Sequence, residues 1–237
     1  MGSHSSLKER KIITNNISYI NQLIRQAEIA AHRPEGIVKL LAVSKGQPSS
    51  KVEEAYTAGQ RDFGENYLQE ALAKIQTLKS LPLCWHFIGP IQSNKTHSIA
   101  HHFSWVHSVS RQKIAEQLNE ARPVFMPPLN VCLQINFDDE ETKSGIHPDQ
   151  AINLASCILQ LPRLRLRGLM LIPKPEADAQ SQYHSFLRLP QLLNTLNQQL
   201  NINMDTLSMG MSNDLQAAIR AGSTMVRIGT AIFGKRT

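Results

Sequence analysis

The stretch Val38-Lys39-Leu40-Leu41-Ala42-Val43-Ser44-Lys45-Gly46 carries the strongest indication of the fold. Its first six residues are almost all apolar, and a short apolar run of this length is typical of a strand buried on both faces. A polar turn follows at Ser44-Lys45-Gly46, and helical periodicity begins soon after, over residues 51–58. A buried strand that leads directly into a helix is the repeating unit of a parallel sheet.

The same strand-and-helix unit recurs along the whole chain. Eight apolar runs alternate with seven helical segments, and the first and last runs are centred near residues 41 and 227, which gives about 27 residues per unit. Eight such units predict an α/β fold of the TIM (β/α)8 barrel type, with an open doubly wound sheet as the alternative. The predicted strands are 38–43, 61–63, 84–88, 104–109, 130–135, 164–171, 206–209 and 225–228, and the predicted helices between them are 51–58, 67–78, 96–102, 112–121, 149–161, 180–200 and 214–221.

The N-terminal region supplies one more helix. Over residues 7–32, apolar side chains recur at every third or fourth position, which predicts an amphipathic helix. The last predicted strand ends nine residues before Thr237, so we expect this N-terminal helix to complete the ring of helices around the barrel. We expect residues 1–6 to be a disordered remnant of an expression tag and residues 7–237 to form a single barrel domain.

Composition limits the class of protein. The chain has 237 residues, of which 41% are hydrophobic, 3 cysteines and a formal net charge of +6. These values exclude a disordered chain and a coiled coil, and no apolar run suits a membrane span or a signal peptide, so we expect a cytoplasmic protein. The positive charge favours an anionic, phosphate-bearing ligand. The odd number of cysteines, without a CxxC pair, indicates buried thiols, and we expect no metal site.

Lys45 is the first candidate for chemistry. In a βα barrel the functional site is built where the strands end, and Lys45 follows the first predicted strand by two residues. Its stem would lie against the barrel wall and its amine at the mouth. Desolvation there lowers the pKa of an amine and lets it attack an aldehyde to form a Schiff base. Taken alone, a solvated lysine at a strand end is the simpler interpretation.

The seventh and eighth predicted strands end in sequences suited to a phosphate. Residues 208–212 supply two serine hydroxyls and Gly210, and Gly229 and Thr230 supply the same two ingredients on the neighbouring strand. Phosphate sites of this fold commonly lie on the loops after these two strands. Ordinary turn and cap chemistry would explain either segment alone, but together they predict a phosphate site.

Arg227 is a candidate for contact with the body of a ligand. It lies two residues before Gly229, so both residues face the same side of the predicted eighth strand. An arginine that faces the barrel lumen needs a partner, because a buried charge must be paired or hydrogen-bonded. A ring nitrogen of a ligand would serve, and a structural pair with Asp62 or Glu65 is the alternative.

Seven segments together resemble the pyridoxal phosphate homeostasis protein family, over residues 40–234. They are AVSK (42–45), FGENY (63–67), WHFIGPIQSNK (85–95), KSG (143–145), RGLM (167–170), LSMGMS (207–212) and VRIGTAIFG (226–234). The resemblance implies a barrel similar to the N-terminal domain of alanine racemase. It also implies that the barrel carries pyridoxal 5′-phosphate (PLP) as a Schiff base on Lys45.

The resemblance implies further roles for single residues. Ser208, Gly229 and Thr230 would hold the phosphate. Arg227 would face the pyridine nitrogen, and Asn66 would line the site near the ring. No residue is assigned a catalytic role. The implied cofactor-binding residues are Lys45, Asn66, Met170, Ser208, Gly210, Arg227, Gly229 and Thr230.

The function that the resemblance implies is storage and delivery of PLP with little or no catalysis. We expect a monomer without membrane contact, whose partners are PLP and PLP-dependent apoenzymes. The chemistry of Arg227 agrees, because a guanidinium stays protonated and donates to the ring nitrogen, which makes the ring a poor electron sink. Racemases of this fold add a second base from a further domain, which we do not expect here. The alternatives are a single-domain PLP-dependent racemase-like enzyme and a nucleic-acid-binding or regulatory protein attracted by the charge of +6.

Overall fold

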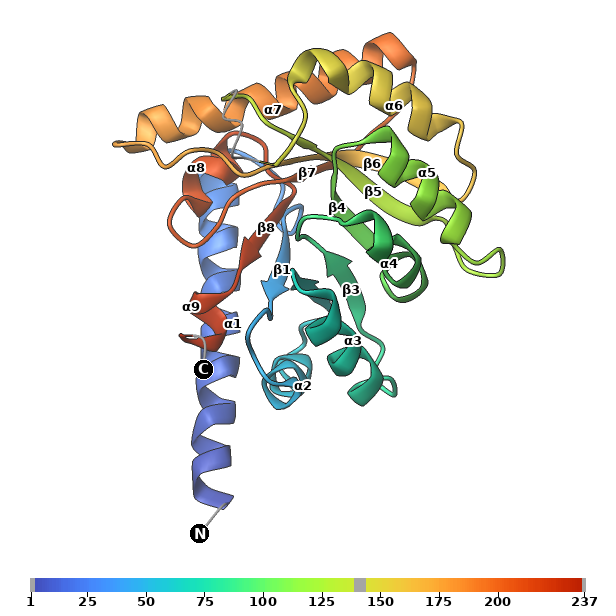
Figure 1. The fold of residues 1–237 in the computed structure, drawn as a ribbon. Helices are drawn as coiled ribbons and strands as arrows, with labels where there is room; N and C mark the ends of the chain where they lie inside the picture. Colours follow the sequence, from blue (N-terminus) through green and yellow to red (C-terminus); the bar gives the residue numbers. More distant parts are fainter. Residues whose placement is uncertain (1–2, 139–143, 236–237) are drawn as a thin grey trace.

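Eight parallel strands form a closed barrel in this computed structural model, which describes residues 3–138 and 144–235 (Figure 1). The strands are β1 (Lys39–Val43), β2 (Asp62–Glu65), β3 (Cys84–Phe87), β4 (Trp105–Val109), β5 (Leu129–Ile135), β6 (Leu164–Leu171), β7 (Thr206–Ser208) and β8 (Met225–Ile228). They are adjacent in chain order, and β1 pairs with β8 as well as with β2. The predicted TIM-barrel fold is confirmed, and the open doubly wound sheet is wrong.

Helices connect the strands and cover the outside of the barrel (Figure 1). Every helix predicted between two strands is present, and none of the described helices combines the length and apolar character needed to cross a membrane. The helices are α1 (Ser3–Ala30), α2 (Ser49–Thr57), α3 (Leu68–Thr77), α4 (Thr96–His102), α5 (Gln112–Ala121), α6 (Ala151–Leu159), α7 (Ala179–Leu200), α8 (Leu215–Arg220) and α9 (Thr230–Phe233), with short 3-10 turns η1 (Ser93–Lys95) and η2 (Pro148–Gln150). Residues 3–6, expected to be disordered, belong to α1, and residues 1–2 lie outside the described part of the chain.

Helix α1 completes the helical ring, as the sequence predicts. It packs against α2, α8 and α9, and therefore fills the position between the last and the first βα units (Figure 1). Its apolar stripe, Ile13, Ile17, Ile20 and Ile24, is at most 4% exposed, and burial of each such side chain contributes roughly 1.5–3 kcal/mol. Asn16 Nδ2 also donates a hydrogen bond of 2.9 Å to the carbonyl of Ile232 in α9.

The barrel lumen has an apolar part and a polar part. Side chains of each strand alternate between the lumen and the helices. Trp105, Cys132 and Met170 form an apolar cluster that is separate from the main core between sheet and helices. Buried polar residues also face the lumen, among them His107, two residues after Trp105 on β4, and Arg227 on β8. The polar part of the lumen is where the structure positions the candidate site.

Candidate functional site

Closure of the barrel brings the predicted site residues to one arc of its mouth. Lys45 follows β1, Asn66 follows β2, Gly210 follows β7 and Gly229 follows β8. These four strands are consecutive around the closed barrel, in the order β7, β8, β1, β2. The carboxyl ends of parallel strands meet at one edge of the sheet. Residues from the two ends of the sequence therefore meet at one site, which an open sheet would not achieve.

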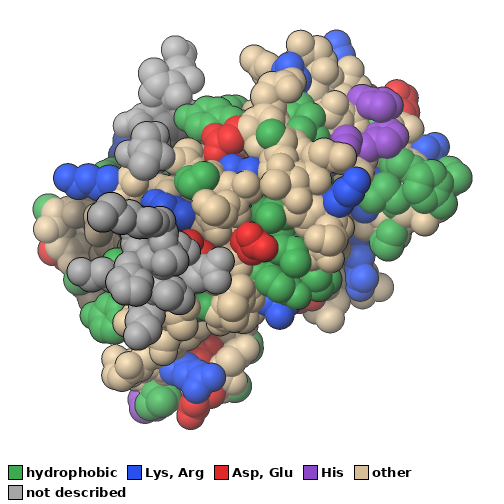
Figure 2. All heavy atoms as spheres, turned by 90° about the horizontal axis from the view of Figure 1, so that it is seen from below, with side chains coloured by type: hydrophobic (Ala, Val, Ile, Leu, Met, Phe, Trp, Pro, Cys, Tyr) green, Lys and Arg blue, Asp and Glu red, His purple; other side chains and the backbone are tan. Residues whose placement is uncertain are grey.

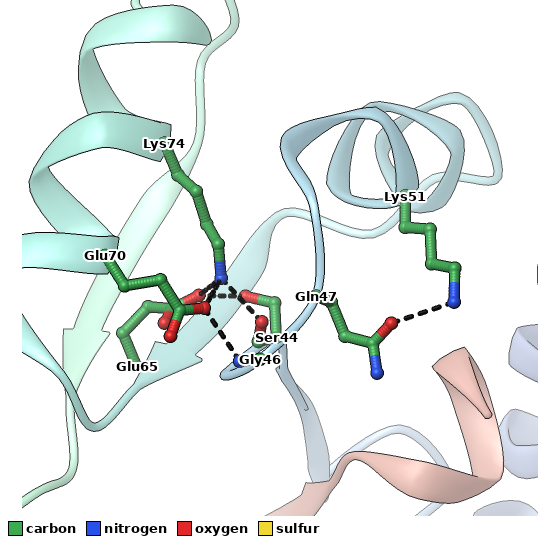
Figure 3. A network of polar contacts seen from close by, with 7 residues as sticks. All are labelled: Ser44, Gly46, Gln47, Lys51, Glu65, Glu70 and Lys74. Carbon is green, nitrogen blue, oxygen red and sulfur yellow. Dashed lines mark hydrogen bonds and ion pairs between the residues drawn. The ribbon is translucent and has the colours of Figure 1, made fainter. Parts of the chain in front are cut away.

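The backbone on both sides of Lys45 is tied to helix α3 (Figure 3). Lys74 Nζ donates a hydrogen bond of 2.6 Å to the carbonyl of Ser44, and the N–H of Gly46 donates one of 2.7 Å to Glu70 Oε1. Gly46 has a φ of 69°, a left-handed conformation that glycine adopts without steric cost. The position of Lys45 is therefore fixed by the two residues that flank it.

The anchor of this segment is a buried ion-pair network on α3 and β2 (Figure 3). Lys74 Nζ lies 2.7 Å from Glu65 Oε1 and also pairs with Glu70, while Ser44 Oγ donates a hydrogen bond of 2.5 Å to Glu65. The side chain of Glu65 is 0% exposed, and burial raises its pKa against the opposing effects of Lys74 and Ser44. Sequence reasoning missed Glu70 and Lys74, although their i,i+4 spacing on a predicted helix was a usable signal.

In each of the two loops expected to bind phosphate, a glycine lies close to a neighbouring element. Gly210 has a φ of 98°, and a Cβ at this position would lie 2.6 Å from the Cβ of Ala218 in α8. A Cβ at Gly229 would lie 3.1 Å from the carbonyl oxygen of Val43, so the end of β8 runs directly beside β1. Thr230 is the exposed first residue of α9. The two glycines therefore let α8 and β1 pack closely against the loops that are expected to bind phosphate.

Arg227 lies in the lumen and is almost completely buried. Its Nη1 donates to the carbonyl oxygen of Ser208 at 2.5 Å and to Ser208 Oγ at 2.9 Å, and its Nη2 donates to the carbonyl of Leu171 at 2.9 Å. Burial lowers the pKa of Arg227 to about 10, with the Asp214 carboxylate opposing the shift, so the guanidinium is charged at neutral pH. Asp62 pairs with His86 and Glu65 with Lys74, and the alternative of a structural pair between Arg227 and either carboxylate is wrong.

The side chain of Ser208, which was expected to hold the phosphate, lies in the lumen, and its role as a phosphate ligand stays a prediction. This residue is 0% exposed, and its hydroxyl lies between Arg227 Nη1 and His107 Nδ1, at 2.9 Å and 2.8 Å. The hydroxyl is therefore engaged in the lumen and does not reach the surface of the loop. Ser212, on the same loop, is exposed and is the serine whose hydroxyl is available to a phosphate.

Asn66 and Met170 differ in what they offer a ligand. The Oδ1 atom of Asn66 is buried and has no hydrogen-bond partner within the described part of the chain. Such an atom is costly unless a ligand or water satisfies it, which fits a cofactor beside β2. Met170 is 0% exposed and packs against Trp105 and Cys132, so it belongs to the wall of the lumen.

Within the described residues, one group could hold a metal ion. Asp62, Cys84 and His86 have ligand atoms within 4.8 Å of one another, and Cys84 and His86 share a face of β3. In the structure His86 Nε2 is hydrogen-bonded to Asp62 Oδ1 at 3.0 Å. Burial and the Asp62 carboxylate raise the pKa of Cys84 to about 12, which disfavours the thiolate that a metal prefers. All three cysteines are free, with Cys132 buried and the other two partly exposed.

Two buried histidines predict loss of stability below about pH 6.5. Burial lowers the pKa of His86, against the effect of Asp62, and lowers that of His107 well below 6.5. The unfolded chain then binds protons that the folded protein does not, so the free energy of unfolding falls as the pH drops below 6.5. The expected slope is up to about 1.4 kcal/mol per pH unit for each histidine.

Urea denaturation between about pH 8 and about pH 5 measures this slope. His107→Gln should remove about half of it, and His97→Gln, on the exposed surface of α4, should leave it unchanged. A free energy of unfolding that stays constant over this range would contradict the prediction.

Comparison with known proteins identifies the class of fold. The family model described as alanine racemase, N-terminal domain, matches residues 11–237. The solved alanine racemase of Corynebacterium glutamicum superposes with a TM-score of 0.71 at 16% identity, covering 96% of this chain and 61% of that one. The barrel and its mouth therefore define a protein of the alanine racemase N-terminal class.

Proteins with higher sequence identity to this chain identify the family within this class. The pyridoxal phosphate homeostasis protein of Pseudomonas aeruginosa is 58% identical over 224 residues, 94% of this chain and 96% of the relative. That of Escherichia coli K12 is 48% identical over 227 residues, 94% and 97% of the two chains. PipY of Synechococcus elongatus, solved with PLP bound, has a TM-score of 0.79 and 37% identity over 89% and 98% of the two chains. The chain belongs to the pyridoxal phosphate homeostasis protein family, and the resemblance seen in the sequence is confirmed.

Proposed function

We propose that this chain binds PLP in the barrel mouth, holds it as a Schiff base on Lys45 and serves its storage and delivery. The observation that carries the proposal is the position of Lys45 just after β1, the strand that pairs with β8, with its flanking residues anchored to α3. Arg227 lies on β8, and Gly229 follows it. Asn66 Oδ1, which has no partner among the described residues, and the exposed hydroxyls of Ser212 and Thr230 fit a ligand with a polar ring and a phosphate. The names of the relatives and the PLP bound to PipY support the same ligand.

Each part of the site has one task in this proposal. PLP supplies an aldehyde, which condenses with the amine of Lys45 to give a C=N bond and one molecule of water. The loops at residues 210–212 and 229–230 bind the phosphate through the exposed hydroxyls of Ser212 and Thr230 and through backbone N–H groups. The N–H of Met211 is not among them, because it donates to Asp214 Oδ1. Arg227 donates to the ring nitrogen, and Asn66 lines the site beside the ring. Ser208 and Met170 form the floor beneath them.

The charge of Arg227 favours storage over catalysis. With a pKa of about 10 the guanidinium keeps its protons at neutral pH, and it has no acceptor atom. The ring nitrogen it faces must therefore accept and stay unprotonated, and an unprotonated ring withdraws electrons poorly. PLP held in this way is retained for transfer to PLP-dependent apoenzymes, and amino acids are turned over slowly or not at all.

The test of the proposal is covalent capture of PLP by the wild-type protein. Hydride reduction converts a C=N bond to a stable secondary amine, so intact-mass spectrometry and peptide mapping should find one PLP adduct, on the peptide that contains Lys45. Transfer is tested by mixing the PLP-loaded protein with a PLP-dependent apoenzyme and measuring the enzyme activity that is recovered. Absence of any adduct, or an adduct on another lysine, contradicts the proposal.

The racemase alternative has one observation in its favour, the shared fold with alanine racemases. Chiral analysis of alanine and other amino acids after incubation with the loaded protein decides between the two functions. We expect no turnover above the rate of free PLP. Rapid racemisation that disappears when Lys45 is replaced would show that the protein is an enzyme.

The nucleic-acid alternative finds little support on the surface. On the face drawn in Figure 2, Lys and Arg side chains are scattered among other types and do not gather in one stripe. Contact with phosphate backbones over many charges makes binding steeply dependent on salt. We expect no salt-sensitive retention of RNA or DNA by this protein, measured by filter binding at low and moderate ionic strength.

A further inference from the structure

A chain of hydrogen-bonded polar side chains runs through the barrel lumen from Arg227 on β8 to Asp62 on β2. Arg227 Nη1 donates to Ser208 Oγ at 2.9 Å. Ser208 Oγ lies 2.8 Å from His107 Nδ1, and His107 Nε2 lies 3.0 Å from His86 Nδ1. His86 Nε2 lies 3.0 Å from Asp62 Oδ1. The chain uses residues of β8, β7, β4, β3 and β2, and only Arg227 and Ser208 belong to the cofactor site described above.

The two ends of this chain have fixed hydrogen-bonding roles. Arginine has donors only, and an ionised carboxylate has acceptors only. Asp62 is ionised at neutral pH, because its hydrogen bond to His86 and the nearby charges outweigh the effect of burial and lower its pKa. His86 and His107 are both 0% exposed, and burial keeps both rings neutral, each with one N–H and one acceptor nitrogen.

These roles allow only one set of donor-to-acceptor directions for the hydrogen bonds between Arg227 and Asp62. Asp62 must accept from His86 Nε2–H, so Nδ1 of the neutral His86 ring is an acceptor. His107 must then donate to it from Nε2–H, and its own Nδ1 is an acceptor. The Nδ1 atom of His107 accepts a hydrogen bond from the Ser208 hydroxyl. The lone pairs of Ser208 Oγ then remain to accept from Arg227. Every donor in the chain therefore points from Arg227 toward Asp62.

We propose that His107 and His86 are positioning residues for the cofactor: they orient the Ser208 hydroxyl away from Arg227 and so hold the guanidinium toward the ring nitrogen. The proposal rests on the proposed PLP function. Of the five N–H groups of Arg227, three are used by Ser208 and Leu171. The Nε–H and one Nη2–H remain for a ligand. Trp105, whose ring stacks on His86 at a centroid distance of 5.5 Å, keeps this part of the chain in place.

The tautomers of the two histidines test the direction of the hydrogen bonds in the protein without PLP. Two-bond ¹H–¹⁵N correlation spectra at neutral pH distinguish neutral Nε2–H, neutral Nδ1–H and charged imidazole. We expect both His86 and His107 to be neutral and to carry the proton on Nε2. A proton on Nδ1 of either ring, or a charged ring, would reverse or break the chain and overturn the proposal.

Paired substitutions at His107 test its effect on the cofactor. Asparagine places its amide near the position of Nδ1 and can still accept from Ser208, whereas glutamine reaches the position of Nε2 and cannot. Asparagine is one methylene shorter than glutamine and loses more packing at this buried position, so a purely structural role would weaken His107→Asn at least as much as His107→Gln. We expect His107→Asn to keep the wild-type PLP affinity and visible absorption band, and His107→Gln to bind PLP about tenfold more weakly with a shifted band.

Further measurements separate the possible failures. Equal PLP affinity and equal spectra for the two variants would overturn the proposal. If neither variant folds, Ser208→Ala replaces them, because it removes the hydroxyl that links His107 to Arg227 with a smaller change in volume. Unchanged PLP affinity in that variant would also overturn the proposal. If the wild-type protein takes up no PLP at all, the proposed function fails, while the tautomer spectra still decide the direction of the chain.

Discussion

Replacing Lys45 with alanine is expected to abolish covalent PLP binding. The amine of Lys45 is the group that would join the aldehyde, and its position is set by the anchored peptide groups of Ser44 and Gly46. Without this amine, PLP is held only through its phosphate and its ring nitrogen, and it dissociates on dialysis. The measurement is intact-mass spectrometry after hydride reduction, which should show one adduct in the wild type and none in Lys45→Ala.

Lys51→Ala is the matched control for this prediction. Lys51 lies on α2, six residues further along the chain, and its Nζ donates to Gln47 and to the carbonyl of Phe233. Because its amine is held by these two partners, the variant should give the wild-type adduct. A full adduct in Lys45→Ala would mean that another lysine reacts, and the assignment of the site to the end of β1 would be wrong.

The sequence predicted the fold well because the hydrophobic pattern of a parallel barrel is local. Each buried strand and each amphipathic helix leaves its own period in the sequence, and segments 164–171 and 225–228 were predicted with the bounds that the structure gives. The rule that strand ends carry the site then led directly to Lys45, Gly210 and Gly229. Whether β1 pairs with β8 has no local signal, and it is this pairing that separates a barrel from an open sheet.

The parts that sequence reasoning missed depend on contacts between distant segments. His107 and Ser208 are 101 residues apart, so no spacing rule joins them. Ser208 was expected to hold phosphate, yet it lies two residues before Gly210, as Arg227 lies two residues before Gly229. The alternation that correctly placed Arg227 in the lumen also places Ser208 there. The residue type suggested a phosphate ligand, but its position along the strand decides which way it faces.

Lys74→Met is expected to be the most destabilising single substitution among the charged residues considered. Lys74 Nζ lies 2.7 Å from Glu65 Oε1, and the two side chains are 5% and 0% exposed. Methionine keeps the length of the side chain but leaves Glu65 without its cation and the carbonyl of Ser44 with one donor, the N–H of Gln47, in place of two. Breaking a buried ion pair from one side costs about 3–5 kcal/mol. Urea denaturation of the PLP-free protein measures the loss, and Lys113→Met, on the exposed face of α5, should change the free energy of unfolding by less than about 0.5 kcal/mol.

The pH dependence of this loss separates electrostatics from packing. Burial raises the pKa of Glu65 in the folded protein, and Lys74 opposes that rise. A carboxyl group with a raised folded-state pKa binds more protons when folded, so its contribution to the free energy of unfolding falls as the pH rises through that range. In Lys74→Met the opposing charge is gone, which raises the pKa of Glu65 further, and the penalty should be smaller at acidic pH, where Glu65 is more protonated, than near pH 8. A penalty equal at both pH values would mean that the network contributes through shape alone, and the anchoring of Lys45 would then survive in any variant that preserves the packing of α3.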